Sequence, residues 1–265
     1  MNPKVAVAQM NCRLGDVQAN LRRINKLAQI VSKREADIVC FPELATTGYS
    51  LNEKWPDFAE PIPGATTDKL SQIANEFGLY LIAGMPERDS QSARIFDSAV
   101  LIDPAGVVLG VYRKVHLWNL ERTYFTPGGE FPVFRTRIGT FGIGICYDLE
   151  FPEPARIMAL NGAELIFFCS AQMKPFERQV SVYVQSRATE NGVFVCFSNR
   201  IGHEGQTVFF GRSQIVSPGC RILARARASE TFVAMRINLT DISRERERLP
   251  YLEHRVPSAY GLLAK

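Results

Sequence analysis

The sequence predicts an α/β fold built on two sheets, with helices on the outer face of each sheet. Residues 4–44 and residues 142–171 each have the pattern strand, helix, strand. Such a unit favours parallel strands whose connecting helix covers one face of the sheet. Most of the expected strands are continuous apolar runs, which is typical of strands covered on both faces. Because the unit occurs once in each half of the chain, we expect two sheets.

Periodicity and helix-ending residues place the elements of the first half. Strands are expected at residues 4–10, 37–44, 79–84, 98–103 and 107–117, and helices at residues 17–31 and 67–77. The first helix follows from apolar side chains at steps of three and four, with Asp16 as its N-cap. Gly78 ends the second helix, and the Pro-Ala-Gly turn at residues 104–106 joins the last two strands in a hairpin.

The second half is assigned in the same way. Strands are expected at residues 139–146, 163–171, 193–199, 207–217, 220–226 and 231–239, and helices at residues 152–162, 176–191 and 243–249. Prolines at the entry and Gly162 at the exit delimit the first of these helices. The last helix alternates positive and negative charges, which indicates a solvated or subunit-facing surface.

Length and composition predict one domain over residues 1–265. The chain has 265 residues, of which 46% are hydrophobic and 22% charged, as in ordinary globular proteins. Its net charge of +4 is scattered without a basic run, so we expect no nucleic-acid partner. We also expect no membrane segment and a cytoplasmic location, because no apolar run reaches the length of a span and the first residues do not resemble a signal peptide.

The six cysteines predict reduced core thiols. They are widely spaced, several lie inside apolar runs, and there is no Cys-x-x-Cys pair with nearby histidines. This pattern argues against a disulfide framework and against a zinc site.

Three apolar strands end in the same unusual way, with an ionisable residue at or just past the carboxyl end. The residues are Glu43 in IVCFPELATTGY, Lys114 in LGVYRKVHLW and Cys146 in IGICYDLEFPE. Ligands of open α/β sheets bind outside the carboxyl ends of strands, so we expect the three side chains to meet there.

A carboxylate, an ammonium and a thiol have a joint chemical purpose. A thiol becomes a good nucleophile when a base or a positive charge lies beside it. Glu43 can accept the proton and later activate water, while Lys114 can favour the thiolate of Cys146 and stabilise an oxyanion. The backbone N–H of Tyr147 is expected to be a second oxyanion donor.

Each residue also has a structural interpretation. Glu43 can cap the loop after Pro42, Lys114 can be a surface charge, and Cys146 can be an inert core thiol. A Cys-His dyad is a further alternative, because His116 shares a strand face with Lys114. A dinucleotide-binding loop is not expected, since Tyr147 stands where the third glycine of the motif would be.

Taken together, the motifs resemble the nitrilase superfamily of carbon-nitrogen hydrolases. The resemblance covers nearly the whole chain and includes VAVAQMN, FPELATTGY, YRKVHLW, GIGICYDLEFPE, RATENGVFV and SQIVSPGCRIL. It implies a four-layer α-β-β-α sandwich, a homodimer or larger homo-oligomer, and neither a metal nor an organic cofactor. The C-terminal tail, at about residues 250–265, is then expected to reach a partner subunit.

The resemblance also implies a Glu-Lys-Cys triad, which corresponds to Glu43, Lys114 and Cys146. A second glutamate that positions substrate and catalytic groups corresponds to Glu121. Its structural alternative is a loop acid paired with Arg122.

The implied activity is hydrolysis of a C–N bond through a thioester on the cysteine. The sequence Cys146-Tyr147-Asp148 is closer to amidases than to true nitrilases, so we expect a small aliphatic or amino-acid-type amide as substrate. N-carbamoyl hydrolysis, nitrile hydrolysis and an inactive scaffold with a reactive thiol are the alternatives.

Loops near the motifs supply candidate substrate-binding residues. Glu150 either receives a substrate amine or caps the helix that follows it. Tyr49, Trp118, Phe125 and Met173 are expected to wall the pocket, although core packing is an equal alternative for each of them.

Overall fold

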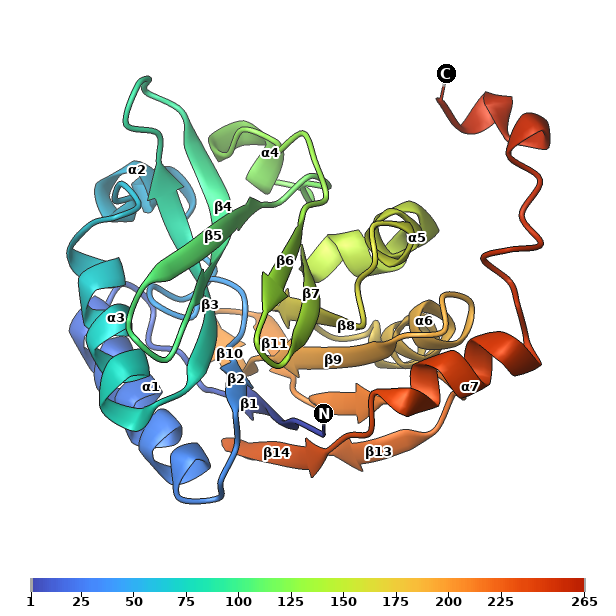
Figure 1. Cartoon of the computed structure of the whole chain (residues 1–265). Coiled ribbons are helices and arrows are strands. Elements are labelled where there is room, and N and C mark those ends of the chain that lie inside the picture. Colours follow the sequence, from blue (N-terminus) through green and yellow to red (C-terminus); the bar gives the residue numbers. More distant parts are fainter. Residues whose placement is uncertain (1, 265) are drawn as a thin grey trace.

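Two six-stranded sheets pack face to face at the centre of the molecule (Figure 1). The computed structural model describes residues 2–264. In order across the first sheet, the strands are β14 (Thr231–Arg236), β1 (Lys4–Gln9), β2 (Ile38–Cys40), β3 (Tyr80–Arg88), β4 (Ile95–Ile102) and β5 (Val108–Arg113). Across the second sheet they are β13 (Ile222–Arg225), β12 (Gln214–Val216), β9 (Phe194–Asn199), β8 (Leu165–Ser170), β7 (Gly139–Ile145) and β6 (Val133–Thr136).

The two sheets have the same topology. Strands β1, β2 and β3 are parallel in the first sheet, and β7, β8 and β9 are parallel in the second. The order β14-β1-β2-β3-β4-β5 therefore corresponds position by position to β6-β7-β8-β9-β12-β13, with antiparallel strands at both edges. This correspondence confirms the two strand-helix-strand units that the sequence predicted.

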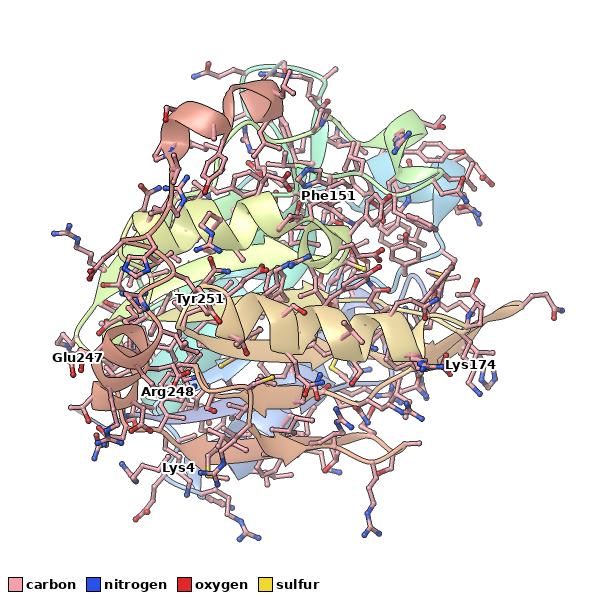
Figure 2. All side chains as sticks on the ribbon, turned by 90° about the vertical axis from the view of Figure 1, so that its right-hand side faces the viewer. Lys4, Phe151, Lys174, Glu247, Arg248 and Tyr251 are labelled. Atoms are coloured by element: carbon pink, nitrogen blue, oxygen red, sulfur yellow. The ribbon has the colours of Figure 1, made fainter. Side chains whose placement is uncertain are left out.

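Two helices cover the outer face of each sheet. Helices α1 (Val17–Ser32) and α3 (Ala65–Phe77) cover the first, while α5 (Pro152–Leu160) and α6 (Glu177–Thr189) lie side by side on the second (Figures 1 and 2). The predicted helix ends are present. Asp16 caps α1 by accepting a hydrogen bond from Ala19 N at 2.9 Å, and Gly78 ends α3 with a left-handed φ of 64°. The layers are thus α-β-β-α, as expected.

The core explains why the strands are apolar along their whole length. Successive side chains of a strand point to opposite faces. In β1, Ala6 and Ala8 pack under α1 and α3, whereas Val5 and Val7 pack between the sheets. Both faces are therefore removed from water.

Several elements differ from the sequence-based expectation. The segment 207–217 is not one strand, because Gly211 and Arg212 have φ values of 70° and 59° that break it. Its first part, β11 (Thr207–Phe210), pairs with the unpredicted β10 (Ile201–Glu204) in a separate hairpin. The unpredicted β6 is a short, partly polar edge strand.

Short helices were missed because a single turn shows no periodicity. They are α2 (Trp55–Phe58), α4 (Glu121–Tyr124) and the 3₁₀ segments at Asn52–Lys54, Cys146–Glu150, Pro257–Ala259 and Gly261–Ala264. Helix α7 (Thr240–Arg248) begins three residues earlier than predicted.

One cysteine expectation was wrong. Five cysteines are buried, but Cys220 is exposed, because it lies in the turn between β12 and β13 and not within an apolar run. No disulfide joins the cysteines that the structure describes, since all six are free thiols.

The C-terminal segment leaves the body of the molecule after α7 (Figure 1). It carries exposed apolar side chains, including Val256, Leu262 and Leu263, the last two 78% and 71% exposed. Met1 and Lys265, which bound the predicted domain and tail, lie outside the described residues. Within residues 2–264, no helix is long and apolar enough to cross a membrane.

Candidate active site

The three strand-end residues converge on one buried place. Glu43 lies three residues after β2, Lys114 follows β5 directly and Cys146 follows β7 directly. Glu43 and Lys114 are fully buried, and Cys146 is 6% exposed. Lys114 Nζ lies 2.5 Å from Glu43 Oε1. A surface role for Lys114 is thereby ruled out.

Lys114 lies among three carboxylates. Its Nζ is 2.7 Å from Glu121 Oε2 and 3.5 Å from Asp97 Oδ2, in addition to the contact with Glu43. Burial lowers the pKa of Lys114, but attraction to Glu121, Glu43 and Asp97 outweighs burial and holds the pKa well above its usual range. The carboxylate oxygens lie within 4.8 Å of one another, so the cluster has the donors for a cation, and the Lys114 ammonium is the cation that contacts all three.

Asp97 was not predicted. It lies inside β4 and is fully buried, and neither of its carboxylate oxygens has a hydrogen-bond partner among the described residues. Burial, followed by the charge of Glu43, raises its pKa well above its usual range. A protonated Asp97 can donate a hydrogen bond to Glu43. The Oε2 atom of Glu43 likewise has no hydrogen-bond partner among the described residues. The signal in the sequence is a single acid inside the apolar run IFDSAVLI.

Cys146 lies at a sharp turn between β7 and a 3₁₀ segment. Its φ of 45° is in the left-handed region, which non-glycine residues rarely adopt. Burial and then the charge of Glu43 raise the pKa of its thiol well above the usual range, while Lys114 and the Ala171 backbone N–H lower it. Lys114 lowers the pKa of the Cys146 thiol, as expected, but burial and the charge of Glu43 raise this pKa by more. The raised pKa favours the protonated thiol.

His116 forms a different interaction from the Cys-His dyad considered above. Its Nδ1 lies 2.8 Å from Asp148 Oδ1, and its ring stacks on Phe151 with centroids 3.9 Å apart. Asp148 is fully buried and also accepts from Tyr112 Oη at 2.6 Å and from Ile145 N at 2.9 Å. His116 and Asp148 thus hold the turn around Cys146.

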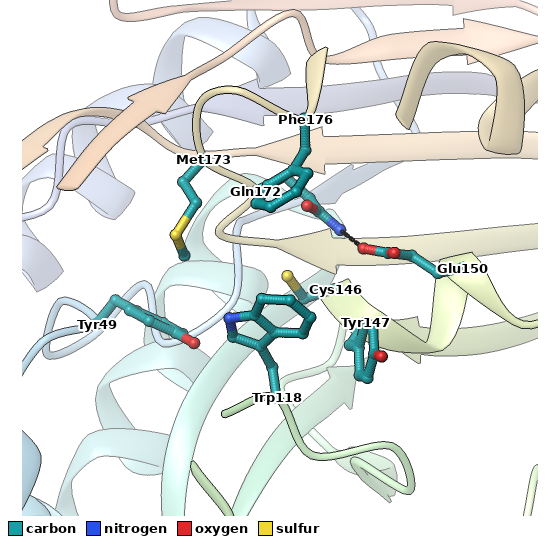
Figure 3. Close-up of a pocket in the computed structure, with 8 residues that line it drawn as sticks. All are labelled: Tyr49, Trp118, Cys146, Tyr147, Glu150, Gln172, Met173 and Phe176. Carbon is teal, nitrogen blue, oxygen red and sulfur yellow. Dashed lines mark hydrogen bonds between the residues drawn. The ribbon is translucent and has the colours of Figure 1, made fainter. Parts of the chain in front are cut away.

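A small pocket, partly open to solvent, lies at the Cys146 sulfur, with a cavity volume of about 30 Å³ (Figure 3). So small a cavity fits a small substrate. The pocket is lined by Tyr49, Trp118, Cys146, Tyr147, Glu150, Gln172, Met173 and Phe176.

Three of the four predicted wall residues, Tyr49, Trp118 and Met173, line this pocket together with Glu150, and the fourth, Phe125, does not. Phe125 is buried against Trp55, with ring centroids 4.9 Å apart. Gln172 and Phe176 were missed. Both follow β8, whose carboxyl end lies beside that of β7, so their place after an apolar strand was the available signal.

Comparison with known proteins places the chain in a family. Residues 4–247 match the family model for carbon-nitrogen hydrolases. The chain belongs to this family. It is thus a hydrolase of carbon-nitrogen bonds.

Amidases are among the relatives of this hydrolase. It is 33% identical to an omega-amidase NIT2 of Xenopus tropicalis, over 93% of this chain and 92% of the relative. It is 32% identical to an (R)-stereoselective amidase of a Pseudomonas species, over 95% and 91% of the two chains.

A solved structure of an amidase mutant from Nesterenkonia sp. AN1 is also similar. The TM-score is 0.87 at 28% identity, and the match covers 97% of this chain and 95% of the other. That mutant carries the acetamide moiety of fluoroacetamide covalently added at its active-site cysteine.

In this hydrolase, Glu121 is part of the buried cluster. It is 4% exposed, accepts from Tyr49 Oη at 2.5 Å and accepts from the Trp118 backbone N–H at 2.8 Å. The ion pair of Glu121 is with Lys114 and not with Arg122, whose Nε donates to Leu117 O at 3.0 Å. Glu121 therefore connects the Lys114 cluster to the pocket wall.

Glu150 lies at the opposite side of the pocket from Tyr49 (Figure 3). Gln172 Nε2 donates to its Oε1 at 3.1 Å. Burial raises its pKa, against smaller lowering effects of Gln172 and Lys114. Phe151 is the N-cap residue of α5 and no side chain there forms a cap hydrogen bond, so the capping interpretation of Glu150 is not supported.

Proposed function

We propose that this hydrolase converts small amides to a carboxylic acid and ammonia, with Cys146 as the nucleophile. The observation that carries the proposal is the contact of the Lys114 ammonium with Glu43 and Glu121 beside a buried thiol that lines the pocket. A base, a cation and a nucleophile are thus buried together, where electrostatic effects are strong.

The first half-reaction forms a thioester. Glu43 accepts the thiol proton while the Cys146 sulfur bonds to the amide carbon. The Lys114 ammonium and the Tyr147 backbone N–H stabilise the oxyanion. Glu43 then passes the proton to the amide nitrogen, the C–N bond breaks and ammonia leaves.

The second half-reaction restores the enzyme. Glu43 accepts a proton from water as the water oxygen bonds to the thioester carbon. The C–S bond breaks, the sulfur takes the proton from Glu43, and the carboxylic acid leaves. The raised pKa of the Cys146 thiol fits this scheme, in which the proton moves to Glu43 as the sulfur attacks.

Glu121 acts here as a positioning residue. Its two oxygens hold Lys114 Nζ, Tyr49 Oη and the Trp118 N–H, so it links the cation to two pocket walls. Loss of Glu121 is expected to disturb both the oxyanion site and the pocket.

Ammonia release from a panel of amides, N-carbamoyl amines and nitriles tests the proposal. We expect turnover of amides, and none by Cys146→Ala. Cys196→Ala is the matched control, because Cys196 is a buried cysteine between the sheets and does not line the pocket. Ammonia release from an amide by the Cys146→Ala variant, or turnover of N-carbamoyl amines or nitriles alone, contradicts it.

A further inference from the structure

The pocket walls contain one acidic side chain and no basic one. Of the eight described residues that line the pocket, Glu150 is the one carboxylic acid, and none is a lysine, arginine or histidine. Two buried cations, Lys114 and Arg187, lie beside lining residues and are already engaged. Lys114 contacts three carboxylates, and Arg187 donates to the carbonyls of Leu149 and Glu150 and pairs with Glu190.

Glu150 has unused capacity to accept hydrogen bonds. Gln172 donates to its Oε1, and its Oε2 has no donor among the described residues. The carboxylate is half-buried, so a partner in the pocket interacts with it more strongly than at an exposed position. Figure 3 shows the Gln172–Glu150 pair facing the space above Cys146.

The remaining walls are aromatic. The ring of Trp118 is edge-on to that of Tyr147, with centroids 4.8 Å apart, and to that of Phe176 at 6.0 Å. Aromatic faces attract cations. A carboxylate opposite a group of aromatic rings is the chemistry that recognises an ammonium group.

We propose that the pocket selects amides that carry a positively charged amino group, and that Glu150 binds this group. The proposal rests on the proposed amide hydrolysis and adds the substrate class. Anionic amides are disfavoured, because Glu150 repels a carboxylate and no cation is among the described residues that line the pocket.

The distance along the chain limits the length of the substrate. Cys146 and Glu150 are the two ends of one 3₁₀ segment. With a rise of about 2 Å per residue, their backbones are separated by roughly 8 Å. Both side chains turn into the same small pocket, so the amino group lies a few bonds from the amide carbon. The substrate is a short amino amide.

Three amides of nearly the same shape test this selectivity. β-Alaninamide, butanamide and succinamate carry an ammonium, a methyl and a carboxylate group at the same position. For the wild-type enzyme we expect kcat/KM for β-alaninamide to exceed that for butanamide by about 10- to 100-fold, with succinamate the poorest. In Glu150→Gln the ratio of β-alaninamide to butanamide is expected to fall close to one.

The matched control is Glu153→Gln, which removes the same charge three residues later at the start of α5. Glu153 does not line the pocket, so the wild-type ratio is expected to persist. Equal rates for the three amides, a preference for succinamate, or a ratio unchanged in Glu150→Gln overturns the ammonium proposal while amide hydrolysis stands. Amide hydrolysis itself fails when turnover does not depend on Cys146. The comparison of the three amides with the wild-type enzyme does not depend on whether any variant folds.

Discussion

At the scale of single residues, the charges around Lys114 do not balance. Three buried carboxylates, those of Glu43, Asp97 and Glu121, contact one ammonium. Buried charges without compensation are costly, so the cluster retains a proton. Asp97 is the best site for it, because burial and Glu43 raise its pKa and its oxygens accept no hydrogen bond from any described residue.

Asp97→Asn is expected to stabilise the protein increasingly as pH rises. Above pH 3.8, the usual pKa of this carboxyl, the unfolded chain loses a proton that the folded chain keeps, so wild-type stability falls with pH until the raised pKa is passed. The variant lacks this loss, which amounts to at most about 1.4 kcal/mol per pH unit. Urea unfolding at several pH values between about 5 and 8 measures it.

The exposed Asp57→Asn is the control for this measurement. A free-energy difference between wild type and Asp97→Asn that is the same at every pH would show that Asp97 is ionised in the folded protein.

Cys146 is expected to be alkylated by iodoacetamide before Cys12, Cys40, Cys169 and Cys196. It lines the pocket, whereas the other four are buried in the core. Because its pKa is raised, the thiolate fraction and the rate should increase with pH from neutral upward. Mass spectrometry of the Cys220→Ser variant checks this, since exposed Cys220 otherwise reacts too. Equal labelling of the five cysteines is the contrary result.

At the scale of elements, the turn between β7 and α5 is built on Asp148. This carboxylate accepts from the turn itself at Ile145 N, from Tyr112 of β5 and from the His116 backbone N–H. Asp148 therefore joins the end of β7 in the second sheet to the end of β5 in the first. From the other side, Arg187 of α6 binds the carbonyls of the same turn.

Asp148→Asn is expected to lower the free energy of unfolding by about 2–4 kcal/mol. The amide group of Asn presents N–H donors where the carboxylate accepts, so at least one buried donor loses its partner. Chemical denaturation measures the loss, with exposed Asp57→Asn expected to change stability by less than about 0.5 kcal/mol. A loss as small as that of the control would show that Asp148 does not hold the turn.

Much at this scale was predictable and some was not. The β1-α1-β2 and β7-α5-β8 units follow from local periodicity, and the hairpin of β4 and β5 from a Pro-Ala-Gly turn. The break between β11 and β12 was not predictable, because Arg212 adopts a left-handed φ that the tertiary structure imposes.

At the scale of the whole molecule, the C-terminal segment has apolar side chains that its own chain does not cover. Val256, Leu262 and Leu263 are all more than half exposed. Exposed apolar groups on a segment that leaves the body are typical of an interface. We therefore propose that the segment packs on a second copy of the chain.

Deleting residues 250–265 is expected to reduce the oligomer to a smaller species. Light scattering coupled to size-exclusion chromatography measures the mass of the full chain and of the truncated one. A double variant with Val256→Asp and Leu262→Asp provides a milder change. A full-length monomer, or an oligomer unaffected by both changes, contradicts this role of the segment.

The sequence by itself determined the α/β class, the two related halves and the strand-end positions of Glu43, Lys114 and Cys146. These features depend on local periodicity and on polar residues that interrupt apolar runs, both of which are visible along the chain. The tertiary structure decided that Asp97 joins the Lys114 cluster, that Phe125 leaves the pocket, and that Gln172 and Phe176 enter it. Contacts across two packed sheets join residues far apart in the chain, and no local pattern specifies their distances.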